Sequence, residues 1–412
     1  MFHRLPSPWN GLLFVLAVYS ASRLLYLASG YLFAAYLPVG WFHERTLDTP
    51  PGTLNIWAHW DGVWYSRIAT EGYGTAGWGP HMATEAYGTT ASTAFFPLYP
   101  LLMRSFAGLF GGPISLGGTS VYGVLISLLC LPFALYFVYR IAEVGWGTRV
   151  ARDAVLLMAF FPTSYFLNAA YTESLFLALS AGSLWALRVR RDPLLACVLA
   201  GFATATRNVG VFLILPLAYE WFRDRDRYGW RVAYLALAPS GLLAYMAYLW
   251  AKFGNPFLFY EAQSYWNRTP TTPLTFATHI LREAGESLAA FVTPQPSGNL
   301  TASGILERLH GTTDAYNALF LVLTLAVLAL GLRVLPFPLS VYAFLLVIPA
   351  ALFGKPETPL IGFPRYMLAA FPLFIVLAVL LANRRAFSIW LVSSAAFSLV
   401  LCALFVSWRF TA

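Results

Sequence analysis

The chain has 412 residues, of which 59% are hydrophobic and only 11% charged, against about 25% charged residues in an ordinary soluble domain. So few charges cannot cover a soluble surface, and apolar runs of about 20 residues recur from end to end, which excludes a secreted, fibrous or disordered chain. The formal charge of +8 comes from short basic clusters between the apolar runs, a pattern that sets membrane topology and argues against a nucleic-acid surface. The sequence therefore predicts an all-α, polytopic membrane protein with about nine or ten spans.

The predicted spans follow one another along the whole chain. The first begins just after Met1-Phe2-His3-Arg4, and we expect it to be retained because it is longer than the apolar core of a signal peptide and lacks a clear cleavage site. Hydropathy places nine spans at residues 10–37, 118–139, 153–170, 174–188, 232–251, 314–332, 337–353, 364–382 and 387–407.

Arginine-rich short connections predict the sidedness of the chain. Since positive charge in short loops stays in the cytoplasm, the two long connections at residues 38–117 and 252–312 are predicted to face the exterior. The first should carry interfacial helices, and the second should carry one helix near residues 274–291. The basic connections are Arg140/Arg149/Arg152, Arg188/Arg190/Arg191, Arg223/Arg225/Arg227/Arg231 and Arg384/Arg385.

Residues 193–222 have basic clusters at both ends, so an even number of crossings is required, and thirty residues are too short to cross twice. We predict a re-entrant helical hairpin that turns near residues 204–208. Backbone of this kind is tolerated at membrane depth where it is buried in protein or lines a wet cavity. The alternative is one long tilted span with an inverted C-terminal half.

The first exterior loop contains the leading catalytic candidate, Asp61. If residues 57–68 are helical, Asp61 lies within an aromatic stripe that should restrict water around its carboxylate. A general base must be ionised and must reach the hydroxyl that it deprotonates, which suits this setting. The alternatives are an N-terminal cap or a salt bridge to Arg67. The stripe consists of Trp57, Trp60, Trp64 and Ile68.

Glu173 lies between two short apolar spans with no basic residue nearby in the sequence. An ionisable group at the exterior edge of the membrane is costly and therefore suggests a function. The alternative is an acidic residue that complements the dipole of the helix that follows it.

Arg207 and Arg365 stand apart from the cytoplasmic clusters, at the tip of the predicted hairpin and at the exterior start of a span. A guanidinium at membrane depth suits a pair of phosphate oxygens, so a lipid-phosphate ligand would explain both arginines. Lys355 lies on the same exterior connection as Arg365 and could add a point charge. Each of the three could instead snorkel or pair with a carboxylate.

Neither a metal site nor a nucleotide site is predicted. The three cysteines lie far apart in apolar spans, the six histidines form no metal-binding set, and no glycine-rich loop follows a strand. The sequence therefore predicts no tightly bound metal and no cofactor.

Several motifs resemble those of the PIG-V mannosyltransferases, within the GT-C class of integral membrane glycosyltransferases. They run in order over the first half of the chain, and a shorter match follows near the end. They are His59-Trp60-Asp61-Gly62-Val63-Trp64-Tyr65, Phe95-Phe96-Pro97-Leu98-Tyr99-Pro100, Phe161-Pro162-Thr163-Ser164, Ala169-Ala170-Tyr171-Thr172-Glu173-Ser174, Ala205-Thr206-Arg207-Asn208-Val209-Gly210 and Pro364-Arg365-Tyr366.

The resemblance implies that mannose moves, with inversion, from a polyprenyl phosphate to a lipid-linked acceptor on the exterior face, periplasmic or lumenal. The acceptor would be a glycolipid or a precursor of the glycosylphosphatidylinositol kind, and the plasma membrane would be the location in a prokaryote. Asp61 would be the base, and Arg207, Arg365 and Lys355 would bind the donor phosphate. The positions expected to bind substrate are His59, Trp60, Trp64, Tyr65, Glu173, Asn208 and Tyr366.

Two other functional classes remain compatible with the sequence. A lipid-linked sugar flippase or another transporter would also need arginines for phosphate and an aromatic cavity, but it does not need a carboxylate on the aromatic face. A noncatalytic subunit of a membrane glycosylation complex would be active only with a partner chain.

Overall fold

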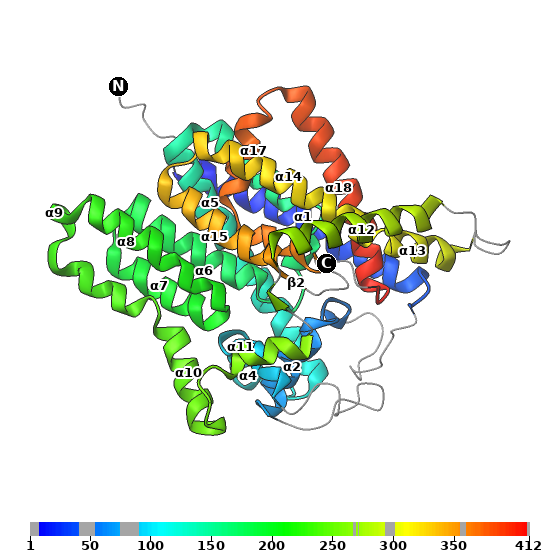
Figure 1. Ribbon diagram of the computed structural model, residues 1–412, viewed down its shortest axis with the longest axis horizontal. Coiled ribbons are helices and arrows are strands. Elements are labelled where there is room, and N and C mark those ends of the chain that lie inside the picture. Colours follow the sequence, from blue (N-terminus) through cyan, green and yellow to red (C-terminus); the bar gives the residue numbers. More distant parts are fainter. Residues whose placement is uncertain are drawn as a thin grey trace.

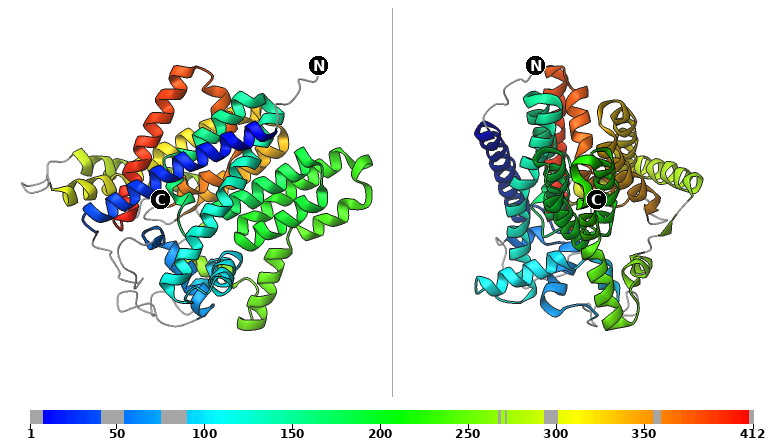
Figure 2. Two further views of the ribbon diagram at one scale, coloured as in Figure 1. Left: turned by 180° about the vertical axis from the view of Figure 1, so that it is seen from behind. Right: turned by 90° about the vertical axis from the view of Figure 1, so that its left-hand side faces the viewer.

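The computed structural model describes residues 8–40, 54–74, 90–266, 269–270, 272–292, 301–354 and 360–409. Within these ranges the chain is almost entirely helical (Figure 1 and, from two further sides, Figure 2), and two short strands, β1 (Thr269–Pro270) and β2 (Phe353–Gly354), pair antiparallel. The predicted all-α class is therefore confirmed.

In the part of the chain that the structure describes, five helical segments are long and apolar enough to cross a membrane, and a sixth is sharply bent. The central one is α5, which contacts α1, α2, α4, α6 and α17. The long apolar helices cover five of the nine predicted spans, and shorter helices account for much of the rest. The long helices are α1 (Pro8–Tyr36), α5 (Leu116–Ala159), α14 (Thr313–Val334), α18 (Arg384–Val406) and the segment Arg225–Phe253, which contains α9 (Arg225–Tyr228), a 3-10 helix (Gly229–Leu237) and α10 (Ser240–Phe253).

The shorter helices belong to the same bundle or to its exterior end. The helix predicted near residues 274–291 is confirmed as α12. In the bundle lie α6 (Glu173–Trp185), α7 (Pro193–Thr206), α8 (Ile214–Arg223), α15 (Phe337–Leu352), α16 (Phe363–Tyr366) and α17 (Pro372–Leu380). From the two predicted exterior loops come α2 (Asp61–Glu71), α4 (Leu98–Leu109), α11 (Leu258–Glu261), α12 (Pro273–Val292) and α13 (Ala302–Gly311).

Two of the predicted spans are wrong as continuous helices. The span 153–170 is the end of α5, which bends at Gly147 (φ 86°) and stops at Ala159, so residues 160–172 are irregular and buried. The span 364–382 is broken by a bend of 91° between α16 with its 3-10 extension and α17. The chain leaves helical backbone at Ala370 (φ −79°, ψ 50°), and Pro372 then begins α17, where a proline is tolerated because the first turn needs no N–H from it. Hydropathy does not detect such breaks because the residues stay apolar.

Residues 193–222 form a helical hairpin. α7 ends at Thr206 and Arg207 is extended; a 3-10 helix (Asn208–Leu213) follows, and α8 returns, so that Glu220 pairs with Arg188 just before the hairpin. The return is tight at Gly210, where a Cβ atom would lie 2.6 Å from the carbonyl carbon of Ala203. Re-entry of this hairpin into the membrane stays a prediction.

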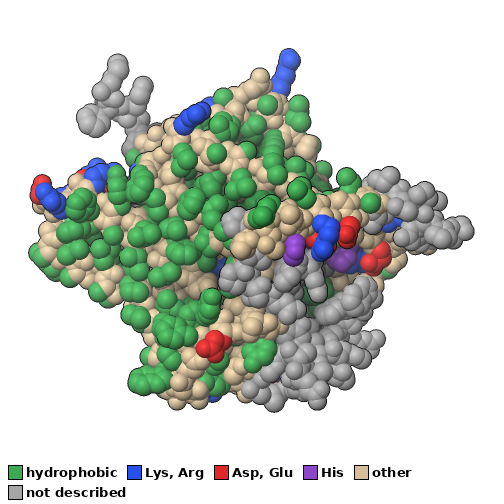
Figure 3. Space-filling view, in the orientation of Figure 1, with side chains coloured by type: hydrophobic (Ala, Val, Ile, Leu, Met, Phe, Trp, Pro, Cys, Tyr) green, Lys and Arg blue, Asp and Glu red, His purple; other side chains and the backbone are tan. Residues whose placement is uncertain are grey.

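The arginine-rich connections gather around the bend of α5. Arg188 and Arg223 share a small cavity with Gly145 and Trp146, and Arg384 pairs with Asp153 a few residues beyond the bend. The face in Figure 3 is largely apolar between its charged edges, and large side chains such as Trp250 (67% exposed) point outward. An outward apolar face of this extent fits lipid contact, so the chain is an integral, multi-pass membrane protein. The prediction that the two long connections face the exterior of the membrane stays a prediction.

The buried Arg23 of α1 stabilises the irregular segment 160–172. Its guanidinium donates hydrogen bonds to the carbonyl oxygens of Ala159 (3.1 Å) and Ser164 (3.0 Å) and to Oδ1 of Asn168 (2.7 Å). The two carbonyl oxygens belong to backbone that leaves the α-helical pattern, where buried carbonyl groups need donors other than helical amides. One cation thus supports the segment that leads into Glu173.

Replacing Arg23 with Gln should destabilise the protein. Because hydrogen bonds from a charged donor contribute roughly 1.5–3 kcal/mol each, we expect a loss of about 2 kcal/mol or more in the free energy of unfolding. Unfolding in detergent, followed by tryptophan fluorescence, measures it. The exposed Arg385→Gln is the matched control and should change little. Equal stability of both variants would contradict the role assigned to Arg23.

Candidate functional site

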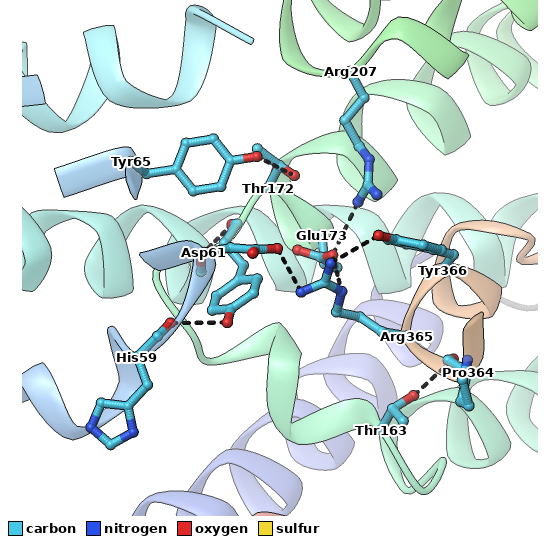
Figure 4. Close-up of polar contacts among 12 residues, drawn as sticks. His59, Asp61, Tyr65, Thr163, Thr172, Glu173, Arg207, Pro364, Arg365 and Tyr366 are labelled. Carbon is cyan, nitrogen blue, oxygen red and sulfur yellow. Dashed lines mark hydrogen bonds and ion pairs between the residues drawn. The ribbon is translucent and has the colours of Figure 1, made fainter. Parts of the chain in front are cut away.

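Four charged side chains from four separate segments meet in one network (Figure 4). Nη1 of Arg365, on α16, lies 2.8 Å from Oδ2 of Asp61, on α2. Nε of Arg365 lies 3.2 Å from Oε1 of Glu173, on α6, and Nη1 of Arg207, at the end of α7, donates a hydrogen bond of 3.0 Å to the same oxygen. Residues far apart in the sequence thus form a single ion-pair network.

The members of this network differ in exposure. The side chains of Arg365 and Glu173 are 4% and 3% exposed, whereas those of Asp61 and Arg207 are 27% and 19% exposed. The buried pair therefore forms the base of the network, and Asp61 and Arg207 form its outer part. Oε2 of Glu173 is buried and has no hydrogen-bond partner among the described residues.

Aromatic rings hold both guanidinium groups in place. The Arg365 guanidinium lies 5.0 Å from the ring centres of Tyr171 and Tyr366, and that of Arg207 lies 5.0 Å from Tyr366. A second contact fixes Arg365, since its Nη2 donates to the Tyr366 hydroxyl at 3.2 Å. A planar cation that stacks and donates at the same time loses little freedom when an anion binds.

Asp61 is positioned by strained backbone just before α2. The helix begins at Asp61, and Trp60 has φ 54° and ψ −115°, which costs a non-glycine residue about 1–3 kcal/mol. The prediction of one helix over residues 57–68 is therefore wrong, because Leu54–Trp57 is a separate 3-10 helix. The predicted stripe does not form one face, and Asp61 instead lies in the first turn of α2, where the helix dipole favours a carboxylate.

The segment that carries Asp61 is fixed to the irregular segment that leads into Glu173. The Tyr171 hydroxyl donates to the His59 carbonyl oxygen at 2.9 Å, and the Ala170 amide donates to the Trp57 carbonyl oxygen at 2.9 Å. The same segment is also tied to α16, because the Thr163 hydroxyl donates to the Pro364 carbonyl oxygen. The relative positions of Asp61, Glu173 and Arg365 are thus set by backbone contacts.

The outer part of the network lines a cavity of about 520 Å³, within the range of small-molecule sites. Polar side chains, among them three members of the network, share the lining of this cavity with apolar side chains. The polar lining is Asp61, Tyr65, Thr206, Arg207, Asn208, Gln263, Arg365 and Tyr366, and the apolar lining includes Phe95, Phe96, Trp266, Leu346, Pro349 and Phe353.

The structure brings most of the predicted site residues together. Asp61, Tyr65, Arg207, Asn208, Arg365 and Tyr366 line the cavity. Glu173 does not line it, because it lies behind the arginines that it pairs with. Lys355 lies outside the residues that the structure describes, so its predicted phosphate contact stays a prediction.

Three predicted substrate residues do not line the cavity. His59 is buried, with Nδ1 3.1 Å from the Phe405 carbonyl oxygen and its ring stacked on Trp408; it points away from the network in Figure 4. Trp60 also packs against Trp408. Trp64 is buried against Phe95 and Trp266, the rings that do line the cavity. These three residues support the site from behind.

Tyr65 can donate a hydrogen bond at the edge of the cavity. Burial raises the pKa of Tyr65 above its ordinary value, with the nearby Asp61 charge adding to this effect and Arg207 opposing it. The phenol therefore keeps its proton at neutral pH. Its oxygen lies 3.5 Å from the Thr172 hydroxyl, next to Glu173.

Sequence reasoning missed Gln263 and Trp266 as site residues. Both follow α11, in the second predicted exterior loop, and reach the cavity because that segment packs against Ala91–Ala94 of the first. Neither residue carries a charge or a spacing that would single it out. Among the described residues, no group of three His, Cys, Asp or Glu side chains is placed to hold a metal ion.

A second apolar groove of about 850 Å³ lies behind the cavity, between α2 and α4 on one side and α7 and α10 on the other. Pro97 and Ala205 line it, and their chain neighbours Phe96 and Thr206 line the first cavity. The Phe96 ring packs on Tyr245, a groove residue, at 5.0 Å. Only a thin wall therefore separates the two spaces.

No model of a known protein family matches the chain, and no curated protein matches it. The structure is similar to the oligosaccharyltransferase of Archaeoglobus fulgidus in the apo form, with a TM-score of 0.46, 15% identity and coverage of 97% of this chain and 56% of that one. It is also similar to ArnT from Cupriavidus metallidurans bound to undecaprenyl phosphate, with a TM-score of 0.33, 13% identity and coverage of 87% and 76%. The chain thus spans little more than half the length of the oligosaccharyltransferase. We infer its function from the chemistry of the cavity.

Replacing Glu173 with Gln should destabilise the protein strongly. The change leaves the buried Arg365 with Asp61 alone, and breaking a buried ion pair costs about 3–5 kcal/mol. Unfolding in detergent measures the loss. Glu286→Gln on α12, whose side chain is 68% exposed, is the matched control. If Glu173→Gln unfolded like the control, Glu173 would not be the support of the two arginines.

Proposed function

We propose that the protein is an inverting glycosyltransferase that moves mannose from a polyprenyl-phosphate donor to a lipid-linked acceptor at the exterior face of the membrane. One observation carries this proposal: a partly exposed carboxylate and two arginines lie together in the lining of one cavity whose other walls are largely apolar. Mannose and the GT-C class come from the resemblance of the motifs, and the arginines and Asp61 supply the chemistry.

In this reaction Asp61 acts on the acceptor. Its carboxylate takes the proton of the acceptor hydroxyl while the hydroxyl oxygen attacks the anomeric carbon of the sugar. The bond between that carbon and the phosphate oxygen breaks on the opposite face, so the configuration inverts. Asp61 suits this role because it lines the cavity and is 27% exposed, and thus can reach a substrate hydroxyl.

The arginines act on the leaving group. Arg207 and Arg365 both line the cavity, so a phosphate held there would meet two guanidinium groups whose positions are fixed by stacking on Tyr366. Preorganised cations stabilise the charge that develops on the departing phosphate and need no reorganisation during the reaction. Glu173 is a positioning residue that acts through both arginines.

Two lipid substrates require two apolar surfaces. The aromatic and aliphatic walls of the cavity suit the isoprenoid chain of the donor, and the groove between α4 and α10 suits the chain of the acceptor. The thin wall at Phe96 would keep the two chains apart, while their head groups meet near Asp61.

A flippase or transporter is the second candidate function, since it would use the same arginines and the same apolar walls. It needs no base beside the phosphate site, and the structure pairs Asp61 directly with Arg365. The two functions predict different results. If the protein is a transporter, Asp61→Asn still moves the carrier across vesicles, and neither the wild type nor the variant forms a glycosidic bond.

Asp61→Asn should abolish transfer of radiolabelled mannose from synthetic polyprenyl-phosphate mannose to membrane lipids. Loss of a general base lowers the rate about 10²–10⁴-fold. Purified wild type and variant are compared, with the exposed Asp226→Asn on α9 as the matched control. A labelled glycolipid from wild type and control, absent with Asp61→Asn, is the expected result. Equal label from all three proteins would exclude Asp61 as the base.

Chelation should leave the activity unchanged. Because the preorganised N–H donors of Arg207 and Arg365 line the cavity and can stabilise the departing phosphate, we expect no divalent ion to be needed. Transfer is measured before and after treatment with EDTA and dialysis. Loss of activity that magnesium or manganese restores would contradict this prediction.

A further inference from the structure

Among the described residues, the ion-pair network carries no spare positive charge. The guanidinium groups of Arg207 and Arg365 face the carboxylates of Asp61 and Glu173, two cations against two anions. Each nitrogen of Arg365 already faces an oxygen: Nε that of Glu173, Nη1 that of Asp61 and Nη2 the hydroxyl of Tyr366. A phosphate that binds Arg365 therefore competes with one of these oxygens.

The structure shows which carboxylate can yield. Glu173 is 3% exposed and its Oε1 contacts both arginines, whereas Asp61 is 27% exposed and contacts Arg365 alone. Moving Glu173 would break two ion pairs inside the protein. Moving Asp61 breaks one ion pair and leaves its carboxylate in the cavity, where it can be solvated or can meet a substrate.

The position of Arg365 does not depend on Asp61. Nε of Arg365 stays on Glu173, Nη2 donates to the Tyr366 hydroxyl, and the guanidinium lies 5.0 Å from the Tyr171 ring. Nη1 is the nitrogen that Asp61 contacts, and Arg365 lines the cavity. A phosphate oxygen could therefore take the place of Oδ2 of Asp61 without any movement of Arg365.

We propose that Arg365 holds Asp61 inactive in the free protein, and that the donor phosphate releases Asp61 as a base by taking its place on Arg365. This inference rests on the proposed function. While Oδ2 of Asp61 is paired with Nη1 of Arg365, 2.8 Å away, this oxygen is not free to take the proton of an acceptor hydroxyl. The base would thus become active only after the leaving group has reached the two arginines, so the donor binds before the acceptor can be deprotonated.

The consequence is that removing the catalytic carboxylate strengthens donor binding. Undecaprenyl phosphate, which has the phosphate and the chain but no sugar, is titrated into purified protein in detergent, and its Kd is measured by calorimetry. Asp61→Asn should bind it about five-fold more tightly than wild type, the factor expected for the loss of one partly exposed competing ion pair. The same variant should give no transfer.

Two further variants separate this effect from a general change of charge. Asp226→Asn, which removes the same charge from the surface of α9, should leave the Kd unchanged. In the Arg365→Gln background the substitution Asp61→Asn should no longer tighten binding, because the contested guanidinium is gone. If this double variant showed the same gain, the competition would not run through Arg365 and the inference would fall.

The possible failures are distinguishable. Equal or weaker binding by Asp61→Asn, together with loss of transfer, would overturn the release of Asp61 and leave the proposed function standing. No binding of undecaprenyl phosphate by a folded wild type, together with no transfer, would overturn both. Tighter binding by Asp61→Asn with unchanged transfer would show that Asp61 competes for the phosphate but is not the base.

Discussion

The site depends on one constraint: Arg365 is buried as a cation and must be neutralised inside the protein. An unpaired charge at such a place would cost many kcal/mol, and a pair repays this cost only when its geometry is good. Here the carboxylate of Glu173 supplies the inner partner and Asp61 the outer one, at 3.2 and 2.8 Å. Because these partners come from α6 and α2, the charge of one side chain fixes how three separate parts of the chain assemble.

The backbone around this cation is irregular in every segment that carries a partner. Asp61 follows the strained Trp60, Glu173 follows the buried residues 161–172, whose only regular element is a 3-10 turn at Ser164–Leu167, and Arg365 follows Gly362, which has φ 80°. Irregular backbone at membrane depth survives only where other groups satisfy its polar atoms. Arg23 does so for residues 159–168, and hydroxyl groups of Thr163 and Tyr171 join the segments. These sharp turns bring the charged side chains of Asp61, Glu173 and Arg365 to one point in an apolar bundle.

The contrast between regular apolar helices and irregular segments that carry the charged residues explains what the sequence could predict. Hydropathy located α14 and α18 because each is one apolar helix, but it could not see the end of α5 at Ala159 or the break at Ala370, where the residues stay apolar. Asp61, Arg207 and Arg365 were predictable because a charge in apolar surroundings is conspicuous. The helix assumed for residues 57–68, the place of His59, and the cavity walls at Gln263 and Trp266 were not, since each depends on contacts between segments distant in the sequence.

The same contacts that make the fold possible also limit the chemistry. A network with equal numbers of cations and anions is compatible with folding, because each charge has a partner of the opposite sign. For an anionic substrate, however, a neutral network is a poor receptor unless one anion can leave it. The difference in exposure between Glu173 and Asp61 resolves this conflict, as the inner carboxylate serves the fold and the outer one remains free to move. Of the two carboxylates that pair with Arg365, Glu173 thus stabilises the fold and Asp61 is available for the reaction.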